Sequence, residues 1–155
     1  MKNHLISTFR YNDWANTEVL KTILALPEKQ EAVRLFSHLI SSQNKWYNRI
    51  KQEVPDETIT WFGSEFNEAE LLPEWKTSVN KWIDLLENTN DSELGQPVKF
   101  KRQLDGKMVF LSLQDLALQL NYHSIHHRAQ INTLISKQGL KPPPTDFIYT
   151  KMQDA

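Results

Sequence analysis

Three of the five histidines in the chain lie within five consecutive positions, at His123, His126 and His127. They fall in a stretch whose leucines and isoleucines recur at helical spacing, which predicts one amphipathic helix over residues 112–137. At about 100° per residue, His123 and His127 lie one turn apart in the apolar stripe, and His126 lies at its edge. Two histidines at positions i and i+4 have the spacing that holds one divalent ion.

A third ligand would complete an open metal site, and His38 is the candidate. It falls near the edge of the apolar stripe of a second predicted helix, whereas His4 lies close to the chain terminus, where helices fray. The alternative is that these are core histidines, hydrogen-bonded to carbonyl or hydroxyl groups. A third inward histidine on another helix favours a metal site with His38, His123 and His127 as ligands.

The elements that would carry these histidines are four amphipathic helices, expected over residues 2–25, 31–51, 70–88 and 112–137. Pro73 is expected in the first turn of the third helix, where proline is tolerated. Apolar and polar residues alternate on both sides of Asp105-Gly106, which predicts a small β-hairpin over residues 98–111. The fold class is therefore all-α, a single-domain four-helix bundle over residues 1–155 with a hairpin between the third and fourth helices.

Residues 52–68 form a long predicted loop that contains Trp61, Phe62 and Phe66. Loops of this length in compact domains are usually functional or mobile, so this one is either a lid or a loop anchored to the core by its aromatic rings. The apolar residues 147–149 near the end of the chain are expected to dock back onto the bundle.

The composition limits the classes of partner. There are 18 basic and 19 acidic residues, and the net charge of −1 argues against a nucleic-acid surface. The chain contains no cysteine, so a thiolate ligand or nucleophile cannot come from the protein. The N-terminal residues have no apolar region typical of a signal peptide, and no apolar run approaches the ~20 residues that span a bilayer. We expect a cytoplasmic protein without a membrane partner.

Three stretches resemble the motifs of one family. HSIHHRAQI at 123–131 resembles the H-x-x-H-H-R-G-Q-[IV] signature of DinB-like (YfiT-like) proteins, with Ala129 in place of the usual glycine. FSHLISSQNKWYNRI at 36–50 and RYNDWANTEVL at 10–20 resemble that family's second-helix and first-helix motifs. The resemblance implies a four-helix bundle whose metal ligands are His38, His123 and His127, with nickel or zinc as the metal.

The resemblance also implies chemistry. Characterised relatives include S-transferases that use bacillithiol, mycothiol or glutathione, and maleylpyruvate isomerase. It suggests a metal-dependent thiol S-transferase that joins a low-molecular-weight thiol to an electrophilic small molecule. Two alternatives stay open: a non-catalytic, stress-related metal-binding bundle, and a metal-dependent hydrolase. Ser124 follows His123 where H-E-x-x-H metalloproteases carry their glutamate base, which counts against peptide hydrolysis of that type.

Residues that accompany the ligands in the family motifs are candidates for the pocket. Tyr11, Trp14 and Trp46 are expected within reach of the open side of the metal, and His126 is a further candidate at its edge. Arg128 is expected on the surface, because at 100° per residue it lies about 140° from His123 and so leaves the apolar stripe. Relatives often form homodimers, so a homodimer is expected here.

Overall fold

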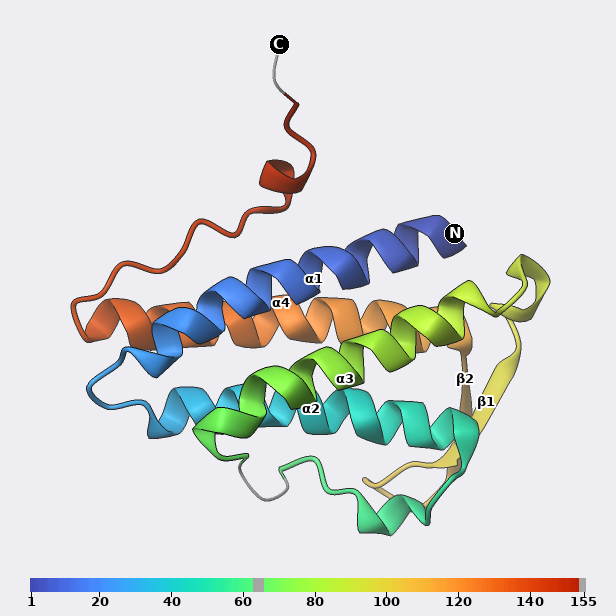
Figure 1. Cartoon of the computed structure of the whole chain (residues 1–155). Helices are drawn as coiled ribbons and strands as arrows, with labels where there is room; N and C mark the ends of the chain where they lie inside the picture. The colour runs from blue at the N-terminus through green and yellow to red at the C-terminus, as the bar shows by residue number, and fades with distance from the viewer. Residues whose placement is uncertain (63–65, 154–155) are drawn as a thin grey trace.

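The computed structural model describes residues 1–62 and 66–153 of the chain. Within them, four α-helices and one antiparallel hairpin follow the predicted order (Figure 1). Their bounds are Lys2–Leu24 (α1), Gln30–Lys51 (α2), Glu68–Glu87 (α3), Pro97–Lys101 (β1), Met108–Ser112 (β2) and Leu113–Lys137 (α4). Short 3-10 helices cover Asp56–Thr58 (η1), Asp91–Glu93 (η2) and Phe147–Thr150 (η3). The predicted all-α bundle with a hairpin between its third and fourth helices is confirmed.

Each helix of the bundle packs mainly against two others. α1 and α2 both pack against α3 and α4, so α1 and α2 lie diagonally across the core. Aromatic rings fill the middle: Trp82 stacks on Phe9 with ring centroids 5.7 Å apart, and Trp75 lies 5.5 Å from Phe36. α4 therefore buries two adjoining sides, one against α1 and one against α2, so its buried face is wider than contact with a single helix would give. Among the described residues, none of the helices is both long and apolar enough to cross a bilayer.

Two helix ends show how local sequence sets the boundaries. Asn67 and Glu70 form a capping box, in which each side chain accepts from the backbone N–H of the other residue, so α3 begins at Glu68. The expectation that Pro73 lies in the first turn is wrong, because this start places it one turn further along. At the other end of the bundle, Gly139 has a φ of +80° just after α4, as expected for a helix-ending glycine.

The hairpin turns its apolar face towards the bundle. Its register pairs Phe100 with Val109. Partly buried and exposed side chains alternate along β1, whereas the expected alternation fails in β2, where Phe110 and Leu111 are both exposed. Residues 102–107 make the turn, with Gly106 at a φ of +69°. The tail docks only in part: Phe147 meets Tyr11 edge-on at 5.2 Å, but it stays exposed, as do residues 148 and 149.

Candidate metal centre

Three histidine rings from two helices point their Nε2 atoms at one another. His38 Nε2 on α2 lies 3.2 Å from His123 Nε2 on α4, and His127 Nε2 lies 3.0 Å from the same atom. The three residues form a group whose ligand atoms all lie within 4.8 Å of one another, and it is the one such group of histidine and acidic side chains in the described residues. The sequence pattern thus anticipated which histidines come together.

Hydrogen bonds on the far side of two rings determine which nitrogen carries the proton. His38 Nδ1 lies 2.5 Å from the backbone oxygen of Trp61, and a carbonyl oxygen can only accept. His127 Nδ1 lies 2.6 Å from Gln130 Oε1, one turn further along α4. Both neutral rings therefore carry their proton on Nδ1 and present the lone pair of Nε2 to the cluster. This is how proteins commonly orient histidines that bind a metal.

The electrostatic surroundings keep the three rings neutral. Burial, together with the neighbouring histidines, lowers the pKa of His123 from 6.5 to about 4. Burial also lowers the pKa of His38 and of His127, against the opposing effect of their hydrogen bonds to Trp61 and Gln130. A neutral imidazole is the form that binds a cation. Three facing lone pairs repel one another unless a proton or a cation lies among them, so the donor set fits a divalent ion that prefers nitrogen ligands.

Aromatic side chains border the cluster. The Phe62 ring stacks on His38 with centroids 4.1 Å apart and an angle of 6°, while 60% of its surface stays exposed. The Arg34 guanidinium lies 5.3 Å from the centroid of the same ring. His126, a predicted pocket residue, is exposed, and its ring lies 5.0 Å from that of His127. The cluster is therefore covered on one side by Phe62 and is not sealed from solvent.

Comparison with known families decides the classification. The sequence pattern of the DinB superfamily matches residues 25–131, more than half of the chain. The chain belongs to the DinB superfamily. The matched region contains His38 on α2 together with His123 and His127 on α4. No curated protein matches the chain.

In this DinB protein His123 lies at the border of the buried face of α4, although the helical spacing had placed it within the apolar stripe. Ser124, Arg128 and Ile131 are buried, whereas His123 is only half-buried. At about 100° per residue, the centre of the buried face lies roughly 90° from His123. The difference arises because α4 packs against α1 as well as α2, which extends the buried face towards polar positions.

The expected surface position of Arg128 is wrong for the same reason. Only 4% of this residue is exposed, and its guanidinium faces α1. Nη1 donates to Asn12 Oδ1 at 2.9 Å and to Asn16 Oδ1 at 3.0 Å, and Nη2 donates to the Tyr11 hydroxyl at 2.7 Å. Burial lowers the pKa of Arg128. Asn16 also donates to Ser124 Oγ at 2.6 Å, so the polar residues of the first-helix motif join α1 to the part of α4 that carries His123 and His127.

The aromatic pocket candidates occupy two different surroundings. The Tyr11 hydroxyl donates to the Thr145 backbone oxygen at 2.9 Å, and the half-buried Trp14 lies 6.3 Å from the Tyr11 ring. Trp46 lies 5.5 Å from Trp61, whose backbone oxygen holds His38. Trp46 is thus connected to a candidate ligand through one residue. That Tyr11, Trp14 and Trp46 reach the open side of a bound metal stays a prediction.

Sequence reasoning missed the residues that orient the candidate ligands. The long loop with its aromatic residues was the available signal, and Trp61 and Phe62 do contact His38. The loop prediction extends over residues 63–65, which lie outside the described residues. Gln130 is three positions after His127 on the same helix, a spacing at which side chains meet, but glutamine at such a position is too common to stand out.

Proposed function

We propose that this DinB protein binds a divalent metal, nickel or zinc, through His38, His123 and His127, and that it is a metal-dependent thiol S-transferase. The observation that carries the metal site is the convergence of three Nε2 atoms, two of them with a tautomer fixed by Trp61 and Gln130. Membership of the superfamily supports the same assignment. The substrates would be a low-molecular-weight thiol and an electrophilic small molecule.

The side chains of the site define what it can contribute to such a reaction. A divalent ion held by three neutral imidazoles would keep its full charge and act as a Lewis acid that lowers the pKa of a thiol or water. Because the chain contains no cysteine, the thiol must come from a cosubstrate. The exposed face of Phe62 beside His38 offers an apolar surface on which a small molecule can pack. The homodimer and the cytoplasmic location stay predictions.

The two alternative functions differ from this one in specific ways. A hydrolase needs a base close to the metal, and Ser124, at the position of the metalloprotease glutamate, is buried and hydrogen-bonded to Asn16. The described cluster is also made of histidines without a carboxylate. A non-catalytic metal-binding bundle would bind the ion equally well but would have no thiol-dependent activity.

Metal content is the first test. The untagged protein and the variants His38→Ala, His123→Ala, His127→Ala and His126→Ala are purified and analysed for metal per chain. We expect about one ion in the parent and in His126→Ala, and a large loss in each of the other three, because two imidazoles rarely hold a divalent ion firmly. His126 is the matched control, since it is a histidine on the same turn of α4. Equal metal content in all five proteins would refute the site.

Activity is the second test. The metal-loaded parent is assayed with bacillithiol, mycothiol and glutathione against a panel of electrophiles, and thiol consumption is followed over time. Turnover that needs both the thiol and the metal supports the S-transferase. Turnover without thiol indicates a hydrolase, and a loaded protein with no turnover across the panel indicates the non-catalytic bundle.

A further inference from the structure

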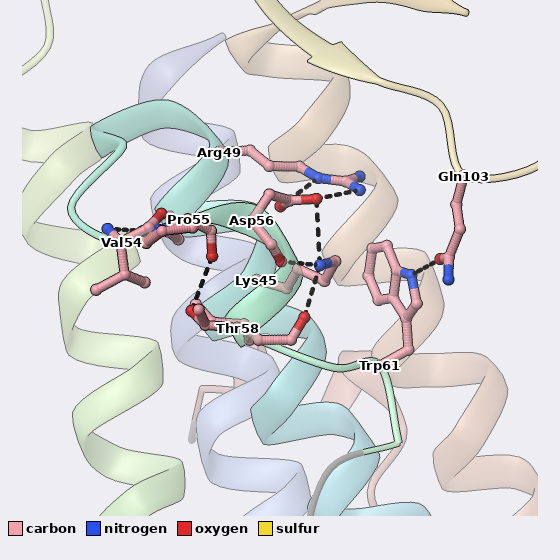
Figure 2. A network of polar contacts seen from close by, with 10 residues as sticks. Lys45, Arg49, Val54, Pro55, Asp56, Thr58, Trp61 and Gln103 are labelled. Carbon is pink, nitrogen blue, oxygen red and sulfur yellow. Dashed lines mark hydrogen bonds and ion pairs between the residues drawn. The ribbon is translucent and has the colours of Figure 1, made fainter. Parts of the chain in front are cut away.

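The segment that follows α2 returns along one face of that helix. We call residues 55–62 the strap. Lys45 and Arg49 follow His38 by seven and eleven residues, so at about 100° per residue each lies within roughly 20° of His38 on α2. Figure 2 shows the strap crossing the end of this face, where Lys45 and Arg49 point towards Asp56.

One end of the strap is anchored by two buried cations. Lys45 and Arg49 are 5% and 6% exposed. Lys45 Nζ donates to the backbone oxygens of Asp56 at 2.5 Å and Ile59 at 2.6 Å, and lies 3.2 Å from Asp56 Oδ2. Arg49 holds the same carboxylate with two parallel bonds of 3.0 and 3.1 Å. A buried cation that loses its partner is strongly unfavourable, so this carboxylate fixes the strap to α2.

The other end of the strap holds the candidate ligand. The Trp61 backbone oxygen accepts from His38 Nδ1, and the next residue, Phe62, stacks on the His38 ring. The Trp61 ring lies over Lys45 and Arg49, at 5.5 and 5.0 Å, and its Nε1 donates to Gln103 Oε1 in the hairpin turn at 2.5 Å. Trp61 is therefore held by both cations that bind Asp56 (Figure 2).

We propose that Asp56 is a positioning residue for His38: through Lys45 and Arg49 it fixes the strap whose Trp61 carbonyl sets the tautomer and orientation of the ring. This inference rests on the proposed metal site. Histidine in water prefers to carry its proton on Nε2, the atom that faces the cluster. Without the Trp61 carbonyl, that proton would occupy the lone pair that a metal needs, and the ring would be free to turn.

The tautomer is measured directly in the metal-free protein. Long-range ¹H–¹⁵N correlation spectra at pH 7.5 distinguish a ring protonated on Nδ1 from one protonated on Nε2. We expect His38 to be protonated on Nδ1 in the parent and to shift towards Nε2 in Asp56→Asn. The control is Asp13→Asn, which also removes a half-buried carboxylate with several donors, here Lys76 and Trp75, but on the α1–α3 side of the bundle.

The consequence for metal binding is measured by titrating cobalt(II), whose visible spectrum reports the ligand geometry. We expect Asp56→Asn to bind cobalt about tenfold more weakly with an altered spectrum, as is typical when a partner of a ligand is lost, and Asp13→Asn to match the parent. Lys45→Met, which leaves the Arg49–Asp56 pair in place, is expected to shift the His38 tautomer towards Nε2 and to weaken cobalt binding, as Asp56→Asn does. It serves in place of Asp56→Asn if that variant does not fold.

The outcomes separate this inference from the proposed function. If the parent binds no cobalt, the proposed metal site is wrong, while the spectra of the metal-free proteins still decide whether Asp56 positions His38. If the parent binds cobalt, and folded Asp56→Asn and Lys45→Met keep both the parent affinity and the Nδ1 tautomer, the positioning role is refuted. A shift of the tautomer in Asp13→Asn equal to that in Asp56→Asn would also refute it, because the effect would then be a general response to lost stability.

Discussion

Replacing Arg128 with methionine should destabilise the protein strongly, although methionine fills a similar volume. In the parent, the buried guanidinium supplies the hydrogen bonds to Asn12 Oδ1 and Asn16 Oδ1. After Arg128→Met, both amide oxygens stay buried without a donor. The Tyr11 hydroxyl keeps the hydrogen bond that it donates to the Thr145 backbone oxygen.

The size of the effect follows from these contacts. A buried acceptor without a donor costs roughly 1–3 kcal/mol, so the two amides together cost roughly 2–6 kcal/mol. Removing a buried cation relieves part of this cost, because the charge no longer has to be kept out of water. We expect a net loss of about 3 kcal/mol in the free energy of unfolding, which for a domain of this size lowers the melting temperature by about 6–12 °C.

The measurement is thermal and urea unfolding followed by circular dichroism, with Arg102→Met as the control. Arg102 is another arginine that donates hydrogen bonds to side-chain oxygens, in this case the two of the Asp105 carboxylate, but 47% of its side chain is exposed. Exposed ion pairs contribute little to stability, so the control should change the melting temperature little. Equal melting temperatures for Arg128→Met and the parent would show that the contacts between α1 and Arg128 do not stabilise the bundle.

Three further predictions concern the histidine cluster and association. Because burial lowers the pKa of His123 to about 4 and also lowers that of His38 and His127, the folded metal-free protein should lose stability as the pH falls from 6.5 towards 4. Metal binding, which needs the neutral rings of the folded protein, should be lost only as the pH approaches these lowered pKa values. Melting temperatures at pH 7.5 and 5 test this. The drop in melting temperature between these two pH values should be smaller in His123→Ala than in the parent, and an equal drop would contradict the prediction. Gln130→Ala removes the acceptor of His127 Nδ1 and should weaken zinc binding about tenfold in a competition titration, whereas Asn132→Ala on the same helix should not. Sedimentation velocity over a wide concentration range should show a homodimer, and a monomer throughout would exclude it.

The fold could be predicted because its signals are local. Helical spacing of apolar residues, Asp105-Gly106 in the hairpin turn and Gly139 after the last helix each act within a few positions. Which histidines come together could be predicted for a similar reason. The spacing of His123 and His127 is a property of one helix, and His38 falls on the inward side of another.

The contacts around the site could not be predicted, because they join distant segments or use backbone atoms. Arg128 meets Asn12 across 116 positions of sequence, and an arginine considered alone is expected at the surface. The acceptor of His38 is the backbone oxygen of Trp61, and every residue has such an atom. The centre of the buried face of α4 depends on both of its neighbours, so periodicity along that helix alone placed it nearer to His123 than it is.

The separation of the clustered histidines along the chain has a consequence for the kinetics of folding. His38 and His123 are 85 positions apart, and α3 and the hairpin lie between them. Closing a loop of this length costs chain entropy, so we expect the complete cluster to form late in folding. An ion bound there would then stabilise contacts that are absent from the transition state, so it should slow unfolding and leave the folding rate nearly unchanged. The metal would then lengthen the lifetime of the native bundle far more than it would speed its formation.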